Sequence, residues 1–290
     1  MIVVTGATGQ LGRLVVEGLL AKVAAGELPA GQIAAVVRDR AKAADLAERG
    51  VELRVADYGD PRSLVGAFHS GERVLFISGS EVGQRGPQHQ AVIDAAKAAD
   101  VALLAYTGIL GGPNADFQLA AEHKVTEQAI LDAGLPHVFL RNGWYHENHT
   151  AHLASILEHG AVVSNAGSGR VASAARADYA AAAVAVLTGE GHTGAAYELS
   201  GDVAWSFDEY AAEIAAQSGK AITHAAVTAA EHREILTGAG VPEPFAEILT
   251  DVDAAIERGL LAGTSGDLSR LIGRPTTPIS EAIAAALALR

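Results

Sequence analysis

The 290-residue sequence contains no cysteine, and this single absence removes several kinds of chemistry. Disulfide bonds, thiolate metal sites, iron–sulfur clusters and a cysteine nucleophile are all excluded. The fold must therefore be held together by packing and hydrogen bonds, and catalysis must use other side chains.

Positive charge is also scarce, because 21 Lys and Arg stand against 34 Asp and Glu, for a net charge of −13. A nucleic-acid partner is not expected, since neutralising phosphates requires clustered Lys and Arg. The sequence has no uninterrupted apolar run of about 18 residues, so we expect no transmembrane helix and no membrane partner. The first expected strand begins at Ile2, which leaves no room for a signal peptide and predicts a cytoplasmic protein.

Hydrophobic residues make up 49% and charged residues 19%, a composition typical of a globular protein of one or two domains. In the first 140 residues, short β-branched runs alternate with Ala-rich helical stretches. This alternation predicts βαβ units and a parallel sheet covered by helices on both faces. The expected strands are residues 2–5, 33–37, 51–56, 74–77, 101–106 and 137–140, and the expected helices are 11–22, 41–50, 61–68, 87–99 and 119–133.

Beyond Arg141 the alternation becomes less regular, and helices dominate after Phe207. A helix at 178–187 and a strand at 196–200 are expected to return to the sheet. The sequence therefore predicts an α/β protein with a dinucleotide-type domain of residues 1–140, completed by 171–200. Residues 141–170 and 201–290 are expected to form a smaller, mostly helical substrate lobe.

The strongest local motif is G-x-x-G-x-x-G between the first strand and the first helix, and its glycines are Gly6, Gly9 and Gly12. Gly6 permits a tight turn, and Gly9 lets the backbone approach a pyrophosphate at the helix N-terminus. Gly12 lets the helix pack closely. Because the motif follows a strand and opens a helix, it predicts a Rossmann-type doubly wound sheet that binds a dinucleotide. The alternative is a glycine-rich structural turn. The other turn residues expected to contact the dinucleotide are Thr8, Gln10 and Leu11.

The end of the second strand indicates which dinucleotide is bound. A carboxylate there favours NADH by accepting from the ribose hydroxyl, whereas an arginine favours NADPH by binding the 2′-phosphate. The strand runs into Arg38, with Arg13 and Arg40 nearby, so NADPH is favoured over NADH. Asp39 could serve the ribose instead, and Arg38 could be an ordinary exposed charge.

Two further segments lie where strands are expected to end. Asp57 and Tyr58 follow the third strand and could lie against the adenine, although Asp57 could equally be a plain turn residue. Ser78 and Gly79 end the fourth strand, at the carboxyl edge where open α/β sheets bind ligands.

The glycine pattern resembles the short-chain dehydrogenase/reductase superfamily, whose alcohol–ketone members carry Tyr-x-x-x-Lys on the helix after the fifth strand. Two alignments of that helix place Leu119 and His123, or Ala120 and Lys124, at those two positions. The tyrosine acid is absent in both. Hydride transfer to a ketone needs a proton donor, whereas a quinone or conjugated dye needs little such help. His123 could assist catalysis, order a water, or simply fill space.

A closer resemblance extends along almost the whole chain. The sequence is similar to the NmrA-like atypical short-chain reductases, nearest the bacterial type 2 NAD(P)H:quinone oxidoreductases. Residues 165–169 and 240–245 also resemble the triphenylmethane-dye reductases, which are sibling proteins in this family. The matching segments are residues 1–12, 34–41, 56–60, 77–85, 140–145, 176–179, 197–202 and 271–277.

The resemblance implies roles for particular positions. It assigns phosphate binding to the glycine turn and Arg38, and orientation of the acceptor carbonyl or the cofactor amide to Asn142. Trp144 and Tyr145 would offer flat faces to an aromatic acceptor, or would only pack in the core. The residues expected to line the nicotinamide side of the site are Ser78, Gly79, Tyr106, Thr107 and Gly108. Of these, Gly108 is expected to face the substrate.

Three functions follow from these observations. The first is hydride transfer from NADPH to a quinone or similar conjugated acceptor without flavin, and the second is a non-catalytic NADP(H) sensor. The third, reduction of cationic dyes, differs from the first only in its acceptor. The net charge of −13 suits a neutral or cationic small aromatic acceptor, and the Ala-rich helices leave room for a homodimer.

Overall fold

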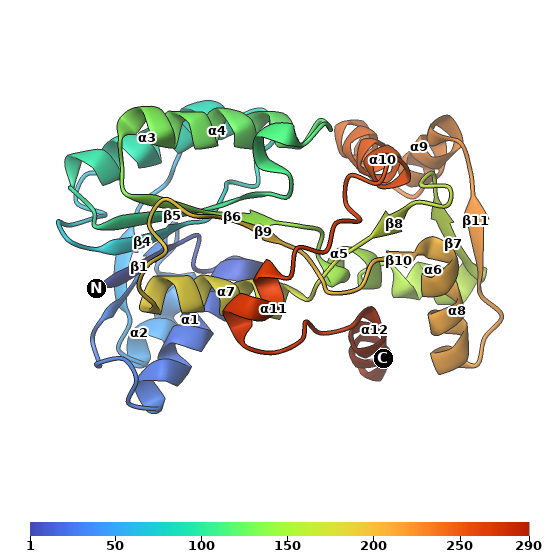
Figure 1. Ribbon diagram of the computed structural model, residues 1–290, viewed down its shortest axis with the longest axis horizontal. Helices are drawn as coiled ribbons and strands as arrows, with labels where there is room; N and C mark the ends of the chain where they lie inside the picture. Colours follow the sequence, from blue (N-terminus) through green and yellow to red (C-terminus); the bar gives the residue numbers. More distant parts are fainter. Residues whose placement is uncertain (290) are drawn as a thin grey trace. The chain divides into compact units, whose positions relative to one another are not determined.

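The computed structural model describes residues 1–289, which form two compact units. The first, called the sheet unit here, contains Met1–Gly112, Glu122–Asn142 and Arg176–Glu198. The second, called the helical unit, contains residues 113–121, 143–175 and 199–289. The architecture is α/β, with a seven-stranded sheet and a largely helical C-terminal region, which confirms the predicted fold class (Figure 1).

The sheet unit is built on one sheet with the strand order β3-β2-β1-β4-β5-β6-β9. Strands β1 to β6 pair in parallel, and β9 joins beside β6 through the Gly194 N–H, which donates to the His137 carbonyl at 2.7 Å. The strands are β1 (Ile2–Thr5), β2 (Ile33–Val37), β3 (Glu52–Val55), β4 (Arg73–Phe76), β5 (Leu103–Ile109), β6 (His137–Asn142) and β9 (Ala196–Leu199).

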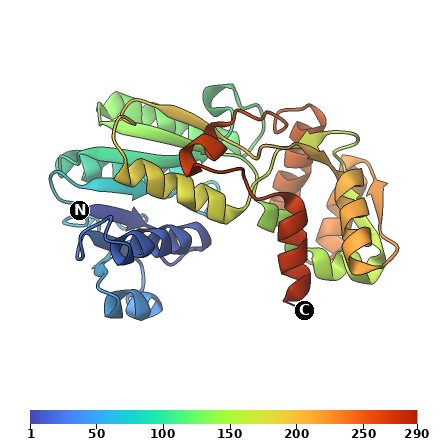
Figure 2. The ribbon, with the colours of Figure 1, turned by 60° about the horizontal axis from the view of Figure 1, so that its bottom comes forward.

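Helices cover both faces of this sheet (Figures 1 and 2). On one face lie α3 (Arg85–Ala98) and α4 (Ala120–Ala133), and on the other lie α1 (Gln10–Ala24) and α7 (Arg176–Thr188). A Cβ added at Gly18 of α1 would lie 2.9 Å from Val184 Cγ2 of α7, so this glycine permits the close packing of the two helices. Two short helices follow β2, η1 (Ala41–Ala43) and α2 (Ala44–Glu48), and η2 (Gly112–Asn114) follows β5.

The chain order of the strands reverses at β1, with β2 on one side and β4 on the other. In open α/β sheets, ligands bind outside the carboxyl ends of the strands at such a reversal. The turn after β1 and the loops after β2 and β4 therefore flank the expected nucleotide position.

The helix predicted at 61–68 is wrong. This segment forms successive turns, in which the Ser63 N–H donates to the Asp60 carbonyl and the Ala67 N–H donates to the Leu64 carbonyl. The Ser63 hydroxyl also donates to the Asp60 carbonyl at 2.7 Å, and such side-chain bonds compete with helix formation. The predicted end of the fifth strand was too early, because β5 continues to pair with β6 as far as Ile109 and Asn142.

The helical unit carries seven helices and two small two-stranded sheets among the described residues. The helices α8 and α9 begin with capping boxes, Ser206 with Glu209 and Thr228 with Glu231. The helices are α5 (His146–Thr150), α6 (Leu153–His159), α8 (Phe207–Ser218), α9 (Ala229–Gly238), α10 (Glu243–Glu257), α11 (Asp267–Ile272) and α12 (Ile279–Ala288). The sheets pair β7 (Ala161–Ser164) with β11 (Thr223–Ala226), and β8 (Arg170–Val171) with β10 (Trp205–Ser206).

Within residues 1–289, no helix has the length and apolar character needed to cross a membrane.

Candidate cofactor and active site

The glycine turn joins β1 to α1 and has the geometry that its motif predicts. Gly6 has a φ of +58°, in the left-handed region that favours glycine. A Cβ at Gly12 would lie 2.3 Å from the Gly6 carbonyl oxygen, so α1 packs directly on the turn. Thr8, Gly9 and Gln10 are exposed at the tip, whereas Leu11 is buried beneath it.

The N-terminus of α1 is open to an anion. Its N-cap residue is Gly9, which has no capping side chain, and its first turn has no acidic residue. The first N–H groups of a helix have no partner within it and carry partial positive charge. A Cβ at Gly9 would lie 3.2 Å from the Gly6 carbonyl oxygen, so a side chain would crowd this position. The residues present therefore fit a dinucleotide pyrophosphate.

Arg38 follows β2 and is more exposed than Arg13. Its side chain is 69% exposed, and Nη1 lies 3.6 Å from Oε1 of Glu81. Arg13, by contrast, is held by Asp45 and lies 3.7 Å from Glu17. Arg38 is the guanidinium best placed to accept a new anionic partner.

Asp57 and Tyr58 both take part in local structure after β3. The Asp57 carboxylate accepts from the Gly59 N–H at 2.9 Å. The hydroxyl of Tyr58 contacts Oγ1 of Thr5 and lies 3.0 Å from the Ile77 carbonyl, and burial raises its pKa. These contacts tie together the carboxyl ends of β1 and β4. A role for Asp57 in cofactor binding stays a prediction.

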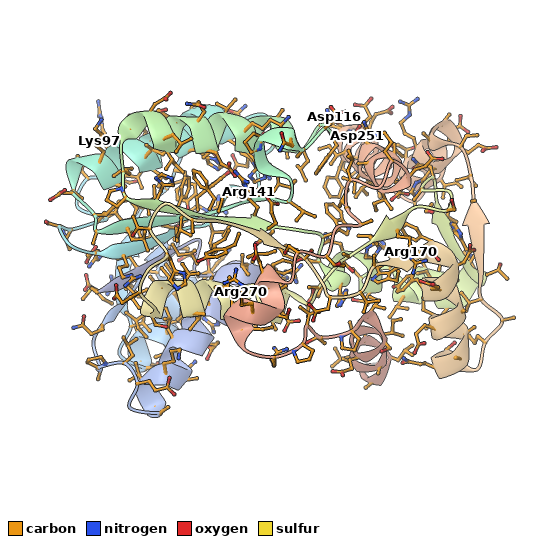
Figure 3. The ribbon with its side chains drawn as sticks, viewed as in Figure 1. Lys97, Asp116, Arg141, Arg170, Asp251 and Arg270 are labelled. Atoms are coloured by element: carbon orange, nitrogen blue, oxygen red, sulfur yellow. The ribbon has the colours of Figure 1, made fainter. Side chains whose placement is uncertain are left out.

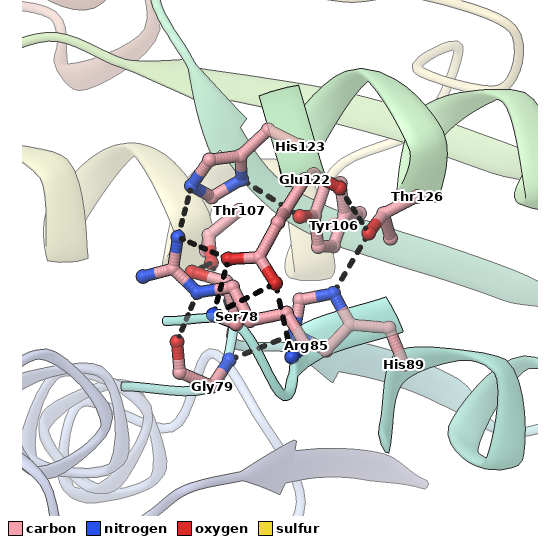
Figure 4. Close-up of polar contacts among 10 residues, drawn as sticks. Ser78, Gly79, Arg85, His89, Tyr106, Thr107, Glu122, His123 and Thr126 are labelled. Carbon is pink, nitrogen blue, oxygen red and sulfur yellow. Dashed lines mark hydrogen bonds and ion pairs between the residues drawn. The ribbon is translucent and has the colours of Figure 1, made fainter. Parts of the chain in front are cut away.

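Ser78 and Gly79 are held by a buried polar network behind the carboxyl edge of β4 and β5 (Figure 4). The Ser78 N–H donates to Oγ1 of Thr107 at 2.9 Å. The Gly79 N–H donates to Nε2 of His89 at 2.9 Å, and its carbonyl accepts from Nε of Arg85 at 2.6 Å. The peptide groups at this edge are thus fixed by side chains that are themselves buried.

His89 has a defined tautomer. Because Nε2 accepts from Gly79, Nδ1 carries the proton and donates to Oγ1 of Thr126 at 2.8 Å. The Thr126 hydroxyl in turn donates to the Glu122 carbonyl at 2.8 Å. Burial, and secondly the nearby Arg85, lower the pKa of His89 to about 4, so the ring is neutral at physiological pH.

His123 lies in the interior, between Tyr106 and Arg85. Nε2 lies 3.4 Å from Nη1 of Arg85, which can only donate, so Nδ1 carries the proton that faces the Tyr106 hydroxyl at 2.8 Å. Burial and the guanidinium lower the pKa of His123 to about 3. Tyr106 has no exposed surface, and burial raises its pKa. Near neutral pH, His123 has no imidazolium proton to give.

Glu122 anchors the chain between β4 and α3. Its carboxylate accepts from the Gly83 N–H at 3.0 Å and from the Arg85 N–H at 3.2 Å, and Oε2 lies 4.0 Å from Nη1 of Arg85. Negative charge is favourable at this helix N-terminus. Glu122 therefore positions the loop that carries Ser78 and Gly79.

Arg141 organises the ends of β5, β6 and β9 (Figure 3). Its guanidinium donates to both Glu127 oxygens, at 3.0 and 2.7 Å, and to Glu198 at 2.8 Å. A Cβ at Gly108 would lie 3.0 Å from Oε1 of Glu127, so a side chain at this position would crowd the carboxylate that Arg141 holds. Asn142 follows directly as the last residue of β6 and is 7% exposed.

The structure places the predicted site residues in different units. All predicted cofactor residues, with His123, Gly108 and Asn142, belong to the sheet unit. Trp144 and Tyr145 belong to the helical unit and are half-buried. The Trp144 carbonyl there accepts from the Ala174 N–H at 3.1 Å, and Tyr145 directly precedes α5. Among the described residues, no group of three or more histidine or carboxylate side chains could hold a metal ion.

Four residues that hold this site were not predicted from the sequence, namely Arg85, His89, Glu122 and Glu127. A signal was present, because Arg85 and His89 continue the buried stripe of α3 that includes Val92 and Ala96. Polar residues at helical positions expected to be apolar indicate a buried network.

The sheet reversal at β1 and the open helix N-terminus define a dinucleotide-binding protein of the Rossmann type. Residues 6–190 match the NAD(P)H-binding family model. Quinone oxidoreductase 2 of Escherichia coli is 47% identical over 98% of this chain and 97% of its own length. The crystal structure of that NADPH-dependent enzyme complexed with NADPH has a TM-score of 0.95 and covers 99% of this chain and 100% of its own.

Two other relatives have different acceptors in their names. The triphenylmethane reductase of Citrobacter sp., complexed with NADP(H), is 43% identical with a TM-score of 0.93 and covers 99% of this chain and 100% of its own. An NAD(P)H azoreductase of Xenophilus azovorans is 32% identical over 97% of this chain and 96% of its own length. The chain belongs to the NAD(P)H-binding, NmrA-like family of oxidoreductases, which confirms the predicted resemblance.

Proposed function

We propose that this protein is an NADPH-dependent oxidoreductase that transfers hydride to a quinone or similar conjugated acceptor, without flavin and without a Tyr/Lys proton donor. Full-length similarity to quinone oxidoreductase 2 supports the reaction class. Residues 1–140 with 171–200 would bind the cofactor, and residues 141–170 with 201–290 would bind the acceptor.

The sheet unit supplies the cofactor contacts. The glycine turn and the N-terminus of α1 hold the pyrophosphate, and Arg38 binds the 2′-phosphate, so NADPH is preferred over NADH. Arg85 and His89 act through Gly79, since they fix its N–H and its carbonyl, and this residue would border the nicotinamide.

NADPH, when bound, supplies a hydride from its reduced nicotinamide ring. A quinone that gains a hydride becomes a delocalised hydroquinone anion, which takes its proton from water and needs no acid on the protein. Asn142 orients the acceptor carbonyl, and Trp144 and Tyr145 stack on the aromatic face, a contact worth about 1 kcal/mol.

The observation that carries the acceptor class is the state of His123. The helix α4 has no tyrosine, and His123 is neutral, 5% exposed and engaged on both ring nitrogens. We therefore assign His123 a positioning role. A site that offers no proton donor would suit acceptors whose reduced forms are delocalised or neutral, and this supports the proposed acceptor class.

Isotope transfer to a cationic triphenylmethane dye tests direct hydride transfer, since such a dye gains a carbon–hydrogen bond that does not exchange with water. The protein, without added flavin, would be given NADPH deuterated at C4 in each of its two configurations. We expect one configuration to place deuterium on the central carbon of the colourless product. Product without deuterium from either configuration would reject direct transfer.

NADPH binding without oxidation by any quinone or dye would instead indicate an NADP(H) sensor.

A further inference from the structure

The loop from Ile77 to Gln84, called the β4–α3 loop here, is firmly held at its base and reaches outward at its tip. At the base, His89 accepts from the N–H of Gly79 and Arg85 donates to the carbonyl of Gly79, and both side chains are buried. At the tip, the side chain of Glu81 is 53% exposed. A fixed base gives Glu81 a restricted range of positions.

The Glu81 carboxylate has two partners. Its Oε2 accepts from Nε2 of Gln88 at 2.9 Å, and its Oε1 lies 3.6 Å from Nη1 of Arg38. Gln88 belongs to α3, the helix that follows this loop, so one partner of the Glu81 carboxylate lies on the same side of the sheet reversal as the loop itself. The other partner, Arg38, lies at the end of β2.

This ion pair joins chain segments on opposite sides of β1. Arg38 follows β2 and Glu81 follows β4, and β1 lies between these two strands in the sheet. The glycine turn leaves the same end of β1. The Arg38–Glu81 contact therefore lies at the strand-order reversal, where a dinucleotide binds.

We infer that Glu81 is a specificity-determining residue that competes with the cofactor 2′-phosphate for Arg38. This inference rests on the proposed function, in which Arg38 binds that phosphate. A carboxylate and a phosphate accept the same kind of hydrogen bond from a guanidinium. An exposed ion pair is weak, so a phosphate can displace Glu81, but the carboxylate that remains nearby repels it. NADH has a neutral hydroxyl in place of the phosphate and does not meet this competition.

Equilibrium titration of the full protein with NADPH and NADH tests the inference without relying on turnover. Glu81→Gln should tighten NADPH binding about threefold, and Glu81→Lys about tenfold. NADH binding should change less than about twofold. The matched control is Glu190→Gln, which removes the same charge from an exposed carboxylate 3.1 Å from Arg73, at the start of β4. This control should leave both affinities unchanged.

A double replacement tests whether Glu81 acts through Arg38. With Arg38→Ala as the parent, Glu81→Gln should tighten NADPH binding by a smaller factor than it does with Arg38 present. The inference would be overturned if Glu81→Gln tightened NADPH binding by the same factor with and without Arg38. It would also be overturned if Glu190→Gln tightened NADPH binding as much as Glu81→Gln does. Neither result would question NADPH binding itself. Failure of the unaltered protein to bind NADPH would overturn the proposed function, and the inference with it.

Discussion

Nδ1 of His123 lies 2.8 Å from the hydroxyl of Tyr106, and both side chains are buried within the sheet unit. His123 lies on α4, the helix that corresponds to the one carrying Tyr-x-x-x-Lys in related reductases, and Tyr106 lies on β5 before it. Neither group donates a proton readily near neutral pH. Burial raises the pKa of the tyrosine, and burial with Arg85 lowers that of the histidine to about 3. These two shifts are the physical basis for the proposal that the acceptor is reduced without an acid from the protein.

The first prediction concerns pH. His123 and His89 have folded-state pKa values of about 3 and 4, below the ordinary value of 6.5, so both are neutral in the folded protein at pH 5 to 8. The unfolded chain binds protons as the pH falls through 6.5, which lowers stability progressively until the folded pKa is reached. Each of these two histidines should therefore lower the free energy of unfolding by up to about 2 kcal/mol when the pH falls from 7 to 5.

Urea unfolding followed by circular dichroism at the two pH values measures this loss. His123→Gln should be less stable at pH 7 but should show a smaller loss on going to pH 5. A loss as large as that of the unaltered protein would show that His123 is protonated in the folded state or accessible to water.

The second prediction concerns Arg38. Arg38→Ala should weaken NADPH binding by about tenfold or more, because a charge-assisted contact to the phosphate is lost, and should affect NADH much less. Titration calorimetry with both dinucleotides provides the comparison. Arg62→Ala, at an exposed arginine in the turn after Asp60, is the control and should change neither affinity. An equal loss for NADPH and NADH would mean that Arg38 does not contact the 2′-phosphate.

The third prediction concerns the glycine turn. A Cβ at Gly12 would lie 2.3 Å from the Gly6 carbonyl oxygen, which is backbone and cannot move aside. Gly12→Ala should therefore abolish measurable NADPH binding and destabilise the protein by about 1–3 kcal/mol, as overpacking does. Gly238→Ala is the matched control, since a Cβ there meets nothing within 4 Å. Normal NADPH affinity in Gly12→Ala would contradict the placement of the cofactor on this turn.

The fourth prediction concerns Asn142. It ends β6 next to Arg141, whose guanidinium pairs with Glu127 and Glu198, and its side chain is the polar group we assign to acceptor orientation. Asn142→Ala should lower turnover about tenfold or more, while NADPH affinity stays within about twofold. Steady-state kinetics together with a separate binding titration distinguishes the two effects. Unchanged turnover would remove Asn142 from the site.

Much of the sheet unit follows from local sequence signals. The strands β1 and β2 are short buried runs rich in Ile and Val, which is typical of a parallel sheet. The glycine spacing after β1 predicts the positive φ of Gly6 and the close packing at Gly12. The error at 61–68 arose because Pro61 suits a helix start, whereas the Ser63 hydroxyl bonds to the Asp60 carbonyl and stabilises turns. Strands such as β8 and β10, at two residues each, are too short to show alternation.

The polar network could not be predicted as a site, because its members are far apart in the sequence. Arg85 and Gly79 are near neighbours, but His123 and Tyr106 meet them only after α3 and α4 pack on the same face of the sheet. Helical spacing can indicate that Arg85 and His89 share a buried face. It cannot indicate which partners they meet there.

The most direct test of the central claim is NADPH oxidation by the purified protein without added flavin, followed at the absorbance of the reduced nicotinamide while simple quinones are added. NADPH should be consumed one-for-one with added quinone, and Asn142→Ala should slow this consumption without loss of NADPH binding. NADPH binding with no quinone-dependent loss of absorbance would contradict the proposed function.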